Sequence, residues 1–289
     1  MPKTSALKNN ITARDFSQTI KHNPLIIHIN LLGLFRMAPN NRERFLKFNV
    51  LLNEIQDFGG NIAIPTYSYT YTKNEIYDVL YTPSELCTLS EYLRVNNKEK
   101  RTVDANFSYL LFGNNFSKRH FKVSDLSSFG EKSLVEDVFN QDGYLGAVGG
   151  ALEYMTEIHF LERKLEVEYR FDKVFPGTSV DKNNNKIDNK ITYFCRDLHS
   201  DYSVSFVQLK KDIRNEGLVK TWNIEKFDIV IEVVKIQDLF DFIKNKISIY
   251  PKNIPPRAVT LRGKINLTNS SFSFLVKIFA FFLKKGISF

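Results

Sequence analysis

Cysteine is scarce in this chain of 289 residues, which contains only Cys87 and Cys195. Two thiols are too few for a disulfide framework or for a zinc site built on several cysteines. The histidines do not compensate, because no two of the five have the spacing of metal ligands: His22, His28, His120, His159 and His199. We therefore expect reduced, partly buried thiols and no metal site.

Long apolar runs are also missing. The longest, residues 272–283, is interrupted by Lys277 and is too short to cross a bilayer. The first 16 residues lack the apolar core of a secretory signal. The sequence thus predicts a cytoplasmic protein.

Signatures of several common enzyme classes do not occur. There is no G-x-S-x-G elbow and no glycine-rich phosphate loop, so the sequence does not favour a serine hydrolase, a kinase or a dinucleotide-binding enzyme. Gly146, Gly149 and Gly150 are close together, but they do not match the phosphate-loop pattern. Their clustering predicts a place where backbone segments pack tightly.

Basic residues outnumber acidic ones, 40 against 32, but the excess is concentrated at one end. Residues 251–289 carry seven cations and no acidic residue, which leaves a net charge of +1 out of +8 for residues 1–250. Because that longer part has no stripe of Lys and Arg interleaved with aromatics, we expect no nucleic-acid partner. We divide the chain into a globular domain, residues 1–250, and a basic, apolar C-terminal tail, residues 251–289.

A strand–helix–strand pattern stands near the N-terminus. Residues 25–32 form an apolar run of strand length, and residues 42–58 place apolar side chains at helical spacing before Gly59 and Gly60. Residues 61–69 predict a second buried strand that stops near Pro65. This order is typical of a βαβ unit, so we expect an α/β fold with a mostly parallel central sheet flanked by helices in three layers, α/β/α.

Other elements follow along the chain. Thr82, Pro83 and Glu85 have the order of a helix start, with Thr82 as the N-cap residue. The remaining expectations are a leading helix or arm in residues 1–23, a helix at about 156–165, a solvated turn at 180–190 with a strand after it, and a strand and amphipathic helix in 225–249.

Thr156, His159 and Glu162 are the residues most suggestive of catalysis. On a helix they lie three positions apart, so each neighbours the next along one flank. A carboxylate beside an imidazole fixes its tautomer and raises its basicity, which a base needs in order to deprotonate an ammonium group. A helical histidine beside an ordinary surface carboxylate has the same spacing, and spacing alone leaves that alternative open.

The chain resembles the aminoglycoside 3-N-acetyltransferase family, antibiotic acetyltransferases with a fold distinct from the GNAT fold, through short motifs that occur in the family's order. They are Ile27–Leu31 for a Val-His-Ser-Ser-Leu turn, Gly60–Ser68 for Gly-Thr-Leu-x-x-Pro-Thr-x-Ser, Thr82–Ser84 with Glu91 and Arg94, Phe129–Leu134 for Phe-Gly-x-x-Ser-Pro-Leu, and Thr156–Glu162 for Thr-x-x-His-x-x-Glu. The resemblance runs from about residue 25 to about 177, and more weakly to about 250.

The resemblance implies an acetyl-CoA-dependent N-acetyltransferase domain in residues 1–250. It makes His159 the catalytic base, supported by Glu162. The tetrahedral oxyanion of such a reaction needs a donor, for which a backbone N–H or the hydroxyl of Thr66 is a candidate. The resemblance places coenzyme A against Ile29, Asn30, Leu31, Leu32, Ser108 and Ser133. It places the acceptor against Tyr67, Ser68, Tyr69 and Asp104.

Departures from the family pattern fall in segments that shape the clefts. Ile29 and Asn30 replace a Ser-Ser pair, Asp104 replaces a histidine, and Cys87 stands where glycine is common. Because these loops differ while the His159 motif is intact, we expect acetylation of an amino sugar, such as a nucleotide-linked sugar for surface polysaccharide. The alternatives are an aminoglycoside 3-N-acetyltransferase that confers antibiotic resistance, and a non-catalytic relative that acts as a binding protein.

The tail has two interpretations of its own. Residues 271–289 are apolar nearly all round if helical, which favours packing against the body or a partner. The aromatics and clustered cations also suit peripheral contact with an anionic lipid surface, which would place the protein at the inner face of the membrane.

Overall fold

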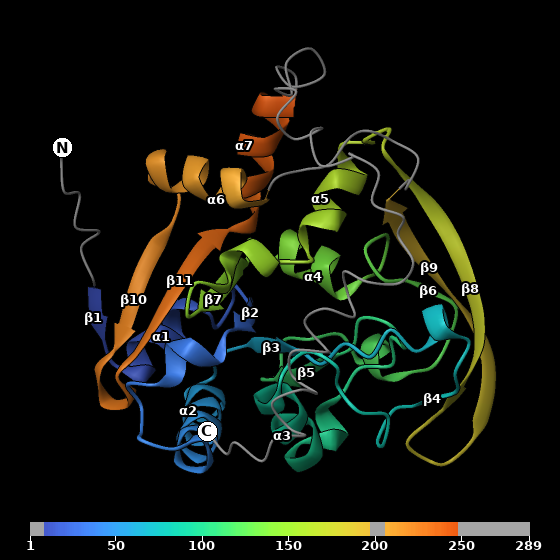
Figure 1. The fold of residues 1–289 in the computed structure, drawn as a ribbon, viewed down its shortest axis with the longest axis horizontal. Coiled ribbons are helices and arrows are strands. Elements are labelled where there is room, and N and C mark those ends of the chain that lie inside the picture. The colour runs from blue at the N-terminus through green and yellow to red at the C-terminus, as the bar shows by residue number, and fades with distance from the viewer. Residues whose placement is uncertain (1–8, 197–205, 248–289) are drawn as a thin grey trace, which may run out of the picture.

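The computed structural model describes residues 9–196 and 206–247. The predicted tail, residues 251–289, lies outside the described residues, and so does its expected contact with a membrane. Within the two described ranges no helix is long and apolar enough to cross a bilayer. The described part consists of a large sheet with helices on both of its faces and a second sheet beside it (Figure 1).

The large sheet has seven strands, and it is mixed rather than mostly parallel as expected. Its order is β1 (Asn9–Ile11), β10 (Lys220–Ile224), β11 (Ile229–Lys235), β7 (Tyr144–Val148), β2 (Leu25–Ile29), β3 (Ile62–Pro65) and β5 (Tyr109–Phe112). Three of the six pairings are parallel, β1–β10, β7–β2 and β2–β3, and the other three are antiparallel. A short connection such as the one between β10 and β11 can join only antiparallel strands, so the parallel expectation fails at this side of the sheet.

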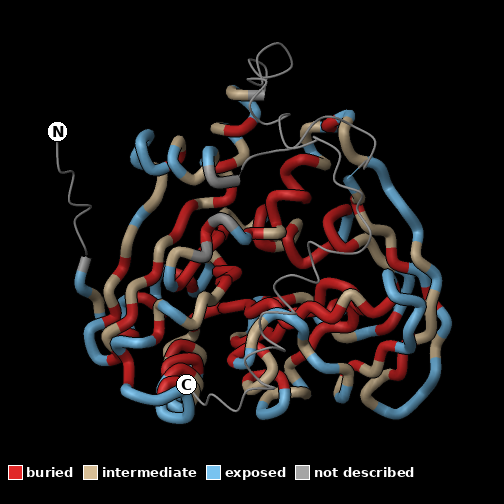
Figure 2. Tube along the Cα trace, in the orientation of Figure 1, coloured by how far each residue is buried: buried red, intermediate tan, exposed pale blue. Residues whose placement is uncertain are grey.

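The expected three layers are present. One layer holds α1 (Ala13–Thr19), α2 (Asn41–Asp57) and α3 (Thr88–Asn96), and the other holds α4 (Leu134–Asn140), α5 (Ile158–Lys164), α6 (Phe206–Asn215) and α7 (Ile236–Ile247). Leu25 and Ile27 of β2 pack in the core of the first layer, while Ile26 between them packs in the core of the second. This alternation places β2 between two apolar layers, and the trace through the middle of the molecule is accordingly buried (Figure 2).

The predicted βαβ unit is confirmed. Strands β2 and β3 pair in parallel, with Leu25 opposite Ile62, and α2 connects them. Asn40 caps α2, because its side chain accepts a hydrogen bond from the backbone N–H of Glu43 at 3.0 Å. This unit directs the carboxyl ends of two strands to the same edge of the sheet, where ligands bind in open α/β folds.

The predicted helix start at Thr82 is wrong, because α3 begins six residues later, at Thr88. The Thr82 hydroxyl instead accepts a hydrogen bond from the N–H of Asp78 at 2.8 Å. The carboxylate of Asp78 in turn accepts bonds from the N–H groups of Leu80 and Tyr81. These local bonds compete with the helix and keep this segment in a turn.

The second sheet has the strand order β4 (Tyr77–Asp78), β8 (Arg170–Val180), β9 (Lys186–Arg196) and β6 (Leu126–Ser127). Strands β8 and β9 form a long antiparallel hairpin, and the turn between them is shorter than the expected 180–190, because residues 186–190 pair with β8 as part of β9. Asp181 closes this turn by accepting hydrogen bonds from the N–H groups of Asn183 and Asn185, both at 2.8 Å. The hairpin runs along one side of the molecule, and much of its trace is exposed (Figures 1 and 2).

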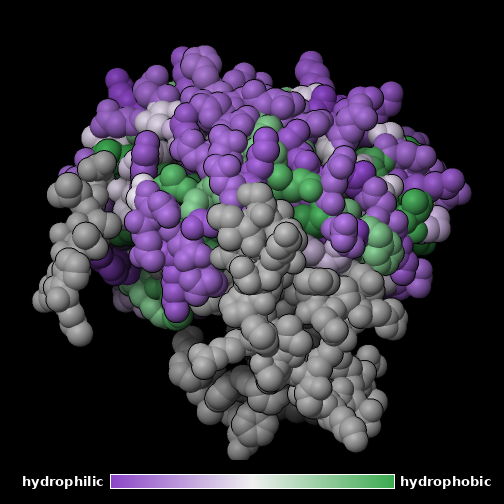
Figure 3. All heavy atoms as spheres, turned by 90° about the horizontal axis from the view of Figure 1, so that it is seen from above, coloured by the Kyte–Doolittle hydropathy of each residue, from purple (hydrophilic) through white to green (hydrophobic). Residues whose placement is uncertain are grey.

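The surface around these elements is mainly polar. On the described part of the face shown in Figure 3, apolar side chains are scattered among hydrophilic ones. The large apolar side chains that are most exposed come from different elements: Leu32, Ile76, Tyr81 and Tyr154. Single exposed apolar side chains of this kind are normal for a folded protein.

Of the three glycines at the end of β7, Gly146 and Gly149 pack closely, as expected, whereas a Cβ on Gly150 would meet only Nζ of Lys210, at 3.8 Å. Gly149 has φ +68°, and a Cβ on it would lie 2.5 Å from the backbone nitrogen of Gly33 and 2.8 Å from the carbonyl oxygen of Asn30. Gly33 belongs to the 3₁₀ turn Leu31–Leu34, which directly follows β2. Gly33 and Gly149 therefore allow the backbone after β7 to touch the turn after β2.

We predict that Gly149→Ala lowers the free energy of unfolding by about 2–4 kcal/mol, because the new methyl group meets backbone atoms and the positive φ becomes strained. Urea unfolding measures the change. Gly217→Ala is the matched control, since Gly217 also has a positive φ, +71°, but has nothing within 4 Å of the added Cβ. Equal losses in the two variants would contradict the close-contact explanation.

Candidate active site

His159 and Glu162 are in direct contact on α5. The Nδ1 atom of His159 lies 2.7 Å from the Oε2 atom of Glu162, and both side chains are buried. The i, i+3 spacing on one helix produces this contact without help from the rest of the fold. The hydroxyl of Thr156 donates to the carbonyl oxygen of Tyr154 at 3.4 Å, and its own carbonyl oxygen accepts from the N–H of His159 at 3.1 Å.

Two residues that the sequence did not suggest complete the surroundings of Glu162. The Nε atom of Arg170, at the start of β8, lies 2.6 Å from Oε2 of Glu162, and its Nη2 atom lies 3.5 Å from Nε2 of His159. The Tyr169 hydroxyl donates to Oε1 of Glu162 at 2.9 Å. The carboxylate thus faces an imidazole, a guanidinium and a phenol.

These contacts determine the tautomer and the protonation of His159. Glu162 accepts a hydrogen bond from Tyr169 and forms an ion pair with Arg170, so it acts as an acceptor and takes the Nδ1 proton of His159 in a further hydrogen bond. The lone pair of the neutral ring then resides on Nε2. Burial lowers the pKa of His159, the hydrogen bond that its ring donates to Glu162 raises it, and the charge of Arg170 lowers it. The net pKa lies below the ordinary value. The ring is therefore neutral at pH 7 and can accept a proton.

Aromatic side chains pack around this ring. Phe129 meets His159 edge-on with ring centroids 5.6 Å apart, and the Tyr193 centroid lies 6.5 Å away. Phe107 joins both of these rings at centroid distances of 4.7 and 4.8 Å. The base consequently stands against an aromatic wall contributed by the loop before α4, by β9 and by the segment before β5.

A second carboxylate lies near the base and was also missed. Glu157, the residue before α5, is fully buried, and its carboxylate is bonded to His28, Tyr67 and Tyr109. A signal for this contact was present in the sequence, because a histidine within the apolar strand 25–32 requires a buried polar partner. No comparable signal existed for Arg170, which reaches Glu162 only through the fold.

The residues predicted to face the acceptor have different environments. Tyr67 is buried against Glu157, and the Ser68 hydroxyl donates to the carbonyl oxygen of Ala105 at 2.9 Å. Tyr69 is partly buried with φ +52°, and burial raises its pKa to about 12. Asp104 is buried and accepts hydrogen bonds from the N–H groups of Asn106 and Phe107, both at 2.9 Å. Of these four residues, Tyr69 is the most exposed.

Thr66 and Ser108 meet in the interior. Their hydroxyl oxygens are 3.1 Å apart, and both residues are fully buried. The Ser108 hydroxyl also donates to the carbonyl oxygen of Thr66 at 2.8 Å and accepts from Nε of Arg101 at 3.1 Å. These bonds join the chain after β3 to β5.

The other residues predicted to bind coenzyme A lie at a strand end and a helix end. Asn30 caps the 3₁₀ turn after β2, because its Oδ1 atom accepts from the N–H of Leu32 at 3.1 Å. Ile29 and Leu31 are partly buried, and Leu32 is 64% exposed. Ser133 caps α4 by accepting from the N–H of Glu136 at 3.2 Å.

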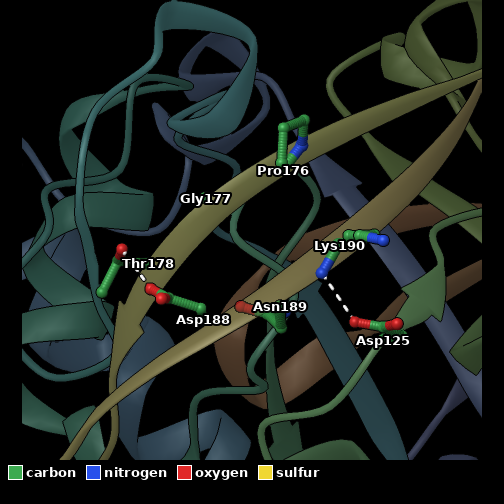
Figure 4. Close-up of a pocket in the computed structure, with 7 residues that line it drawn as sticks. All are labelled: Asp125, Pro176, Gly177, Thr178, Asp188, Asn189 and Lys190. Carbon is green, nitrogen blue, oxygen red and sulfur yellow. Dashed lines mark hydrogen bonds between the residues drawn. The ribbon is translucent and has the colours of Figure 1, made fainter.

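A polar hollow on the β8–β9 hairpin is separate from this site. It is lined by Asp125, Pro176, Gly177, Thr178, Asp188, Asn189 and Lys190. Its polar groups bond one another, since Thr178 donates to Asp188 and the N–H of Lys190 donates to Asp125, each at 2.7 Å (Figure 4). Pro176 is six positions along β8 from Arg170, which is roughly 20 Å of extended strand. We therefore place the candidate active site at His159.

Comparison with known proteins gives consistent results. The model of a family described as aminoglycoside 3-N-acetyltransferase matches residues 54–248. Comparison with curated protein sequences finds no match. Among solved structures, AAC-IIIb in a binary complex with CoASH has a TM-score of 0.62 at 12% identity, covering 83% of this chain and 97% of that one.

Two further structures support the same fold. The YokD protein from Bacillus subtilis has a TM-score of 0.59 at 12% identity, covering 87% of this chain and 97% of its own. The aminoglycoside acetyltransferase AAC(3)-IVa, in a complex with gentamicin, has a TM-score of 0.59 at 15% identity and covers 87% and 95%. At these identities the structural likeness establishes the fold, and the family match extends over more than half of the sequence.

Proposed function

Because this chain belongs to the aminoglycoside 3-N-acetyltransferase family and is an acetyl-CoA-dependent acyltransferase, we propose that it acetylates a primary amine of an amino sugar with His159 as the general base. The observation that carries the proposal is the contact of His159 with Glu162 at 2.7 Å, in a setting that keeps the imidazole neutral. Glu162 is the group that supports the base.

The chemistry follows from the protonation states. The acceptor amine is an ammonium ion near neutral pH and has no lone pair for attack. Nε2 of His159 takes one proton, and the amine nitrogen bonds to the carbonyl carbon of the thioester. The C–S bond then breaks, and the departing thiolate of coenzyme A takes the second proton from the amine nitrogen, so the amide and the free thiol are released. The carboxylate of Glu162 stabilises the imidazolium that forms, because it lies beside Nδ1.

We assign coenzyme A to the turn after β2 and to the start of α4. The turn lies at the carboxyl end of a parallel strand, the usual position of ligands in open α/β sheets. Leu32 at its tip is 64% exposed and offers an apolar surface to the donor. Asn30 keeps the turn in shape, and Ser133 does the same for α4. The role of Thr66 as an oxyanion donor stays a prediction.

For the acceptor, the comparisons favour an aminoglycoside over the surface-polysaccharide sugar that the altered loops suggested. The family model is described by that activity, and gentamicin is bound in the related AAC(3)-IVa structure. An amino sugar with one amine is the second candidate, and the aromatic wall beside His159 favours it. Aromatic rings suit the apolar face of a sugar or a nucleobase, whereas a polycationic drug is attracted by unpaired carboxylates.

An acceptor panel tests the proposal. The full chain is incubated with acetyl-CoA and either aminoglycosides or nucleotide-linked amino sugars, and release of the free thiol is followed. We expect turnover with at least one aminoglycoside and a product heavier by one acetyl group. Turnover confined to the nucleotide sugars would establish the second candidate. If coenzyme A does not bind, the chain is a non-catalytic relative.

A further inference from the structure

The most deeply buried carboxylate in the described part of the chain is that of Glu157, and the proposed reaction gives it no role. It is 0% exposed. Its Oε2 atom lies 2.7 Å from Nε2 of His28, and its Oε1 atom accepts from the hydroxyls of Tyr67 at 2.7 Å and Tyr109 at 2.8 Å. The two hydroxyls are also 2.8 Å from each other. A buried carboxylate is costly unless donors surround it, and here three donors do.

The carboxylate is ionised despite its burial. Burial raises the pKa of Glu157, but attraction to His28 and the hydrogen bonds from His28 and Tyr67 lower it to below its ordinary value. Burial and the nearby carboxylate raise the pKa of both Tyr67 and Tyr109 well above normal, so both phenols stay protonated as donors. With an acceptor-only carboxylate, the Nε2 atom of His28 carries the proton of their shared hydrogen bond.

The three donors come from three neighbouring strands of the large sheet. His28 lies in β2, Tyr67 follows β3 by two residues, and Tyr109 opens β5 opposite Pro65. Their order in the sheet is β2, β3, β5, so one side chain from the α5 layer joins three adjacent strand ends. The backbone carbonyl oxygen of Glu157 meanwhile accepts from the N–H of Phe160 in the first turn of the helix. Glu157 therefore fixes the start of α5 against the sheet.

His159 follows two residues later on that helix. Residues two apart on a helix point to nearly opposite sides, so Glu157 faces the sheet while His159 faces Glu162 and Arg170. Rotation of α5 about its axis would move both side chains together. The hydrogen bonds to Glu157 oppose that rotation. They therefore keep the imidazole of His159 at its position beside Arg170 of the hairpin.

We propose that Glu157 is the positioning residue of the catalytic centre, a buried anion that holds His159 in place. The inference rests on the proposed function, since it assigns Glu157 a role through His159. It extends that function by adding a second carboxylate, bonded to His28, Tyr67 and Tyr109, to the pair formed by His159 and Glu162.

The charges around His159 define what a titration should show. Glu162 on the same helix raises its pKa, Arg170 of β8 lowers it, and Glu157 raises it. Tyr193 of β9 faces the ring at 6.5 Å, and its pKa is raised by burial, so it is uncharged at neutral pH. Removing the charge of Glu157 should accordingly lower the proton affinity of His159.

The test is Glu157→Gln in the full chain, with two readouts. The amide has the size of the carboxyl group, and its oxygen can accept from His28 while its NH2 group donates to the tyrosine oxygens, so it suits the site. Titration of His159 by imidazole NMR, assigned by the peak missing in His159→Gln, should show protonation at lower pH than in the wild type. The kcat for acetyl transfer should fall about tenfold with KM for acetyl-CoA within about twofold.

Two further variants make each outcome decisive. Glu157→Asp keeps the charge, so its His159 should titrate close to the wild-type pH even if kcat falls. Asp137→Asn is the control, because it alters another histidine–carboxylate pair, that of the buried His120 and the partly buried Asp137, at the same distance of 2.7 Å; we expect no change in either readout.

An unshifted His159 titration in Glu157→Gln overturns the inference, whatever happens to kcat. If that variant does not fold, a lowered His159 titration in Glu157→Asp overturns it instead. Failure of the proposed function gives a different result. The wild type would then acetylate no acceptor, while His159 in Glu157→Gln would still titrate at lower pH than in the wild type.

Discussion

Replacing His159 with alanine is expected to lower kcat/KM for acetyl transfer roughly 10²- to 10⁴-fold, the contribution typical of a general base. Nε2 of this ring is the atom that receives the ammonium proton, and the neighbouring carboxylate, Glu162, cannot replace it because its oxygens already face Tyr169 and Arg170. Coenzyme A should still bind, since none of the residues assigned to it is altered. Thiol release measures the rate, and calorimetry measures the binding.

A matched control is available in His120. This histidine is also buried and paired with a carboxylate, at 2.7 Å from Asp137, but it lies outside the candidate site. His120→Gln should retain acetyl transfer within about twofold, the behaviour of a substitution away from the reacting atoms. An active His159→Ala enzyme would remove His159 from the role of base and with it the proposed mechanism.

Opposite changes in the pH dependence of acetyl transfer are expected for Glu162→Gln and Arg170→Met. Glu162 raises the pKa of His159 and Arg170 lowers it. A base must be neutral to act, so activity is lost as the pH falls through the pKa of His159. Glu162→Gln should move this acidic limb to lower pH, while Arg170→Met should move it to higher pH.

The size of the two effects should also differ. Glu162→Gln makes His159 a weaker base and no longer fixes the ring in the tautomer with the proton on Nδ1. The plateau of kcat should therefore fall roughly 10- to 100-fold, as for other carboxylates that orient a histidine. The measurement is kcat/KM and kcat between pH 5 and pH 9, values that bracket the ordinary pKa of histidine, about 6.5. Shifts in the same direction for both variants would mean that these charges do not control His159.

Local patterns in the sequence were enough for several features. The contact of His159 with Glu162 depends on helical spacing, and the βαβ unit depends on the periods of the apolar residues in 25–32 and 42–58. These signals lie within a few residues of each other along the chain, so they survive without knowledge of the fold. The end of β7 was similarly predictable from its glycines.

Features that depend on distant partners were not predictable. Two of the three antiparallel pairings in the large sheet, β11 with β7 and β3 with β5, join strands that are far apart in sequence. Arg170 contacts Glu162 because the chain after α5 turns back and β8 begins beside that helix. No local sequence pattern predicts this turn. The prediction of a helix start at Thr82 was wrong for a different reason. Asp78 forms hydrogen bonds there that stabilise a turn, and helix propensities do not include such bonds.

The β8–β9 hairpin adds a consequence of its own. One strand begins at Arg170, beside the base, and continues to the water-facing turn at Asp181. The guanidinium of Arg170, which lowers the proton affinity of His159, thus belongs to the second sheet and not to the seven-stranded sheet. A ligand that displaces Arg170 from this position would therefore raise the proton affinity of His159.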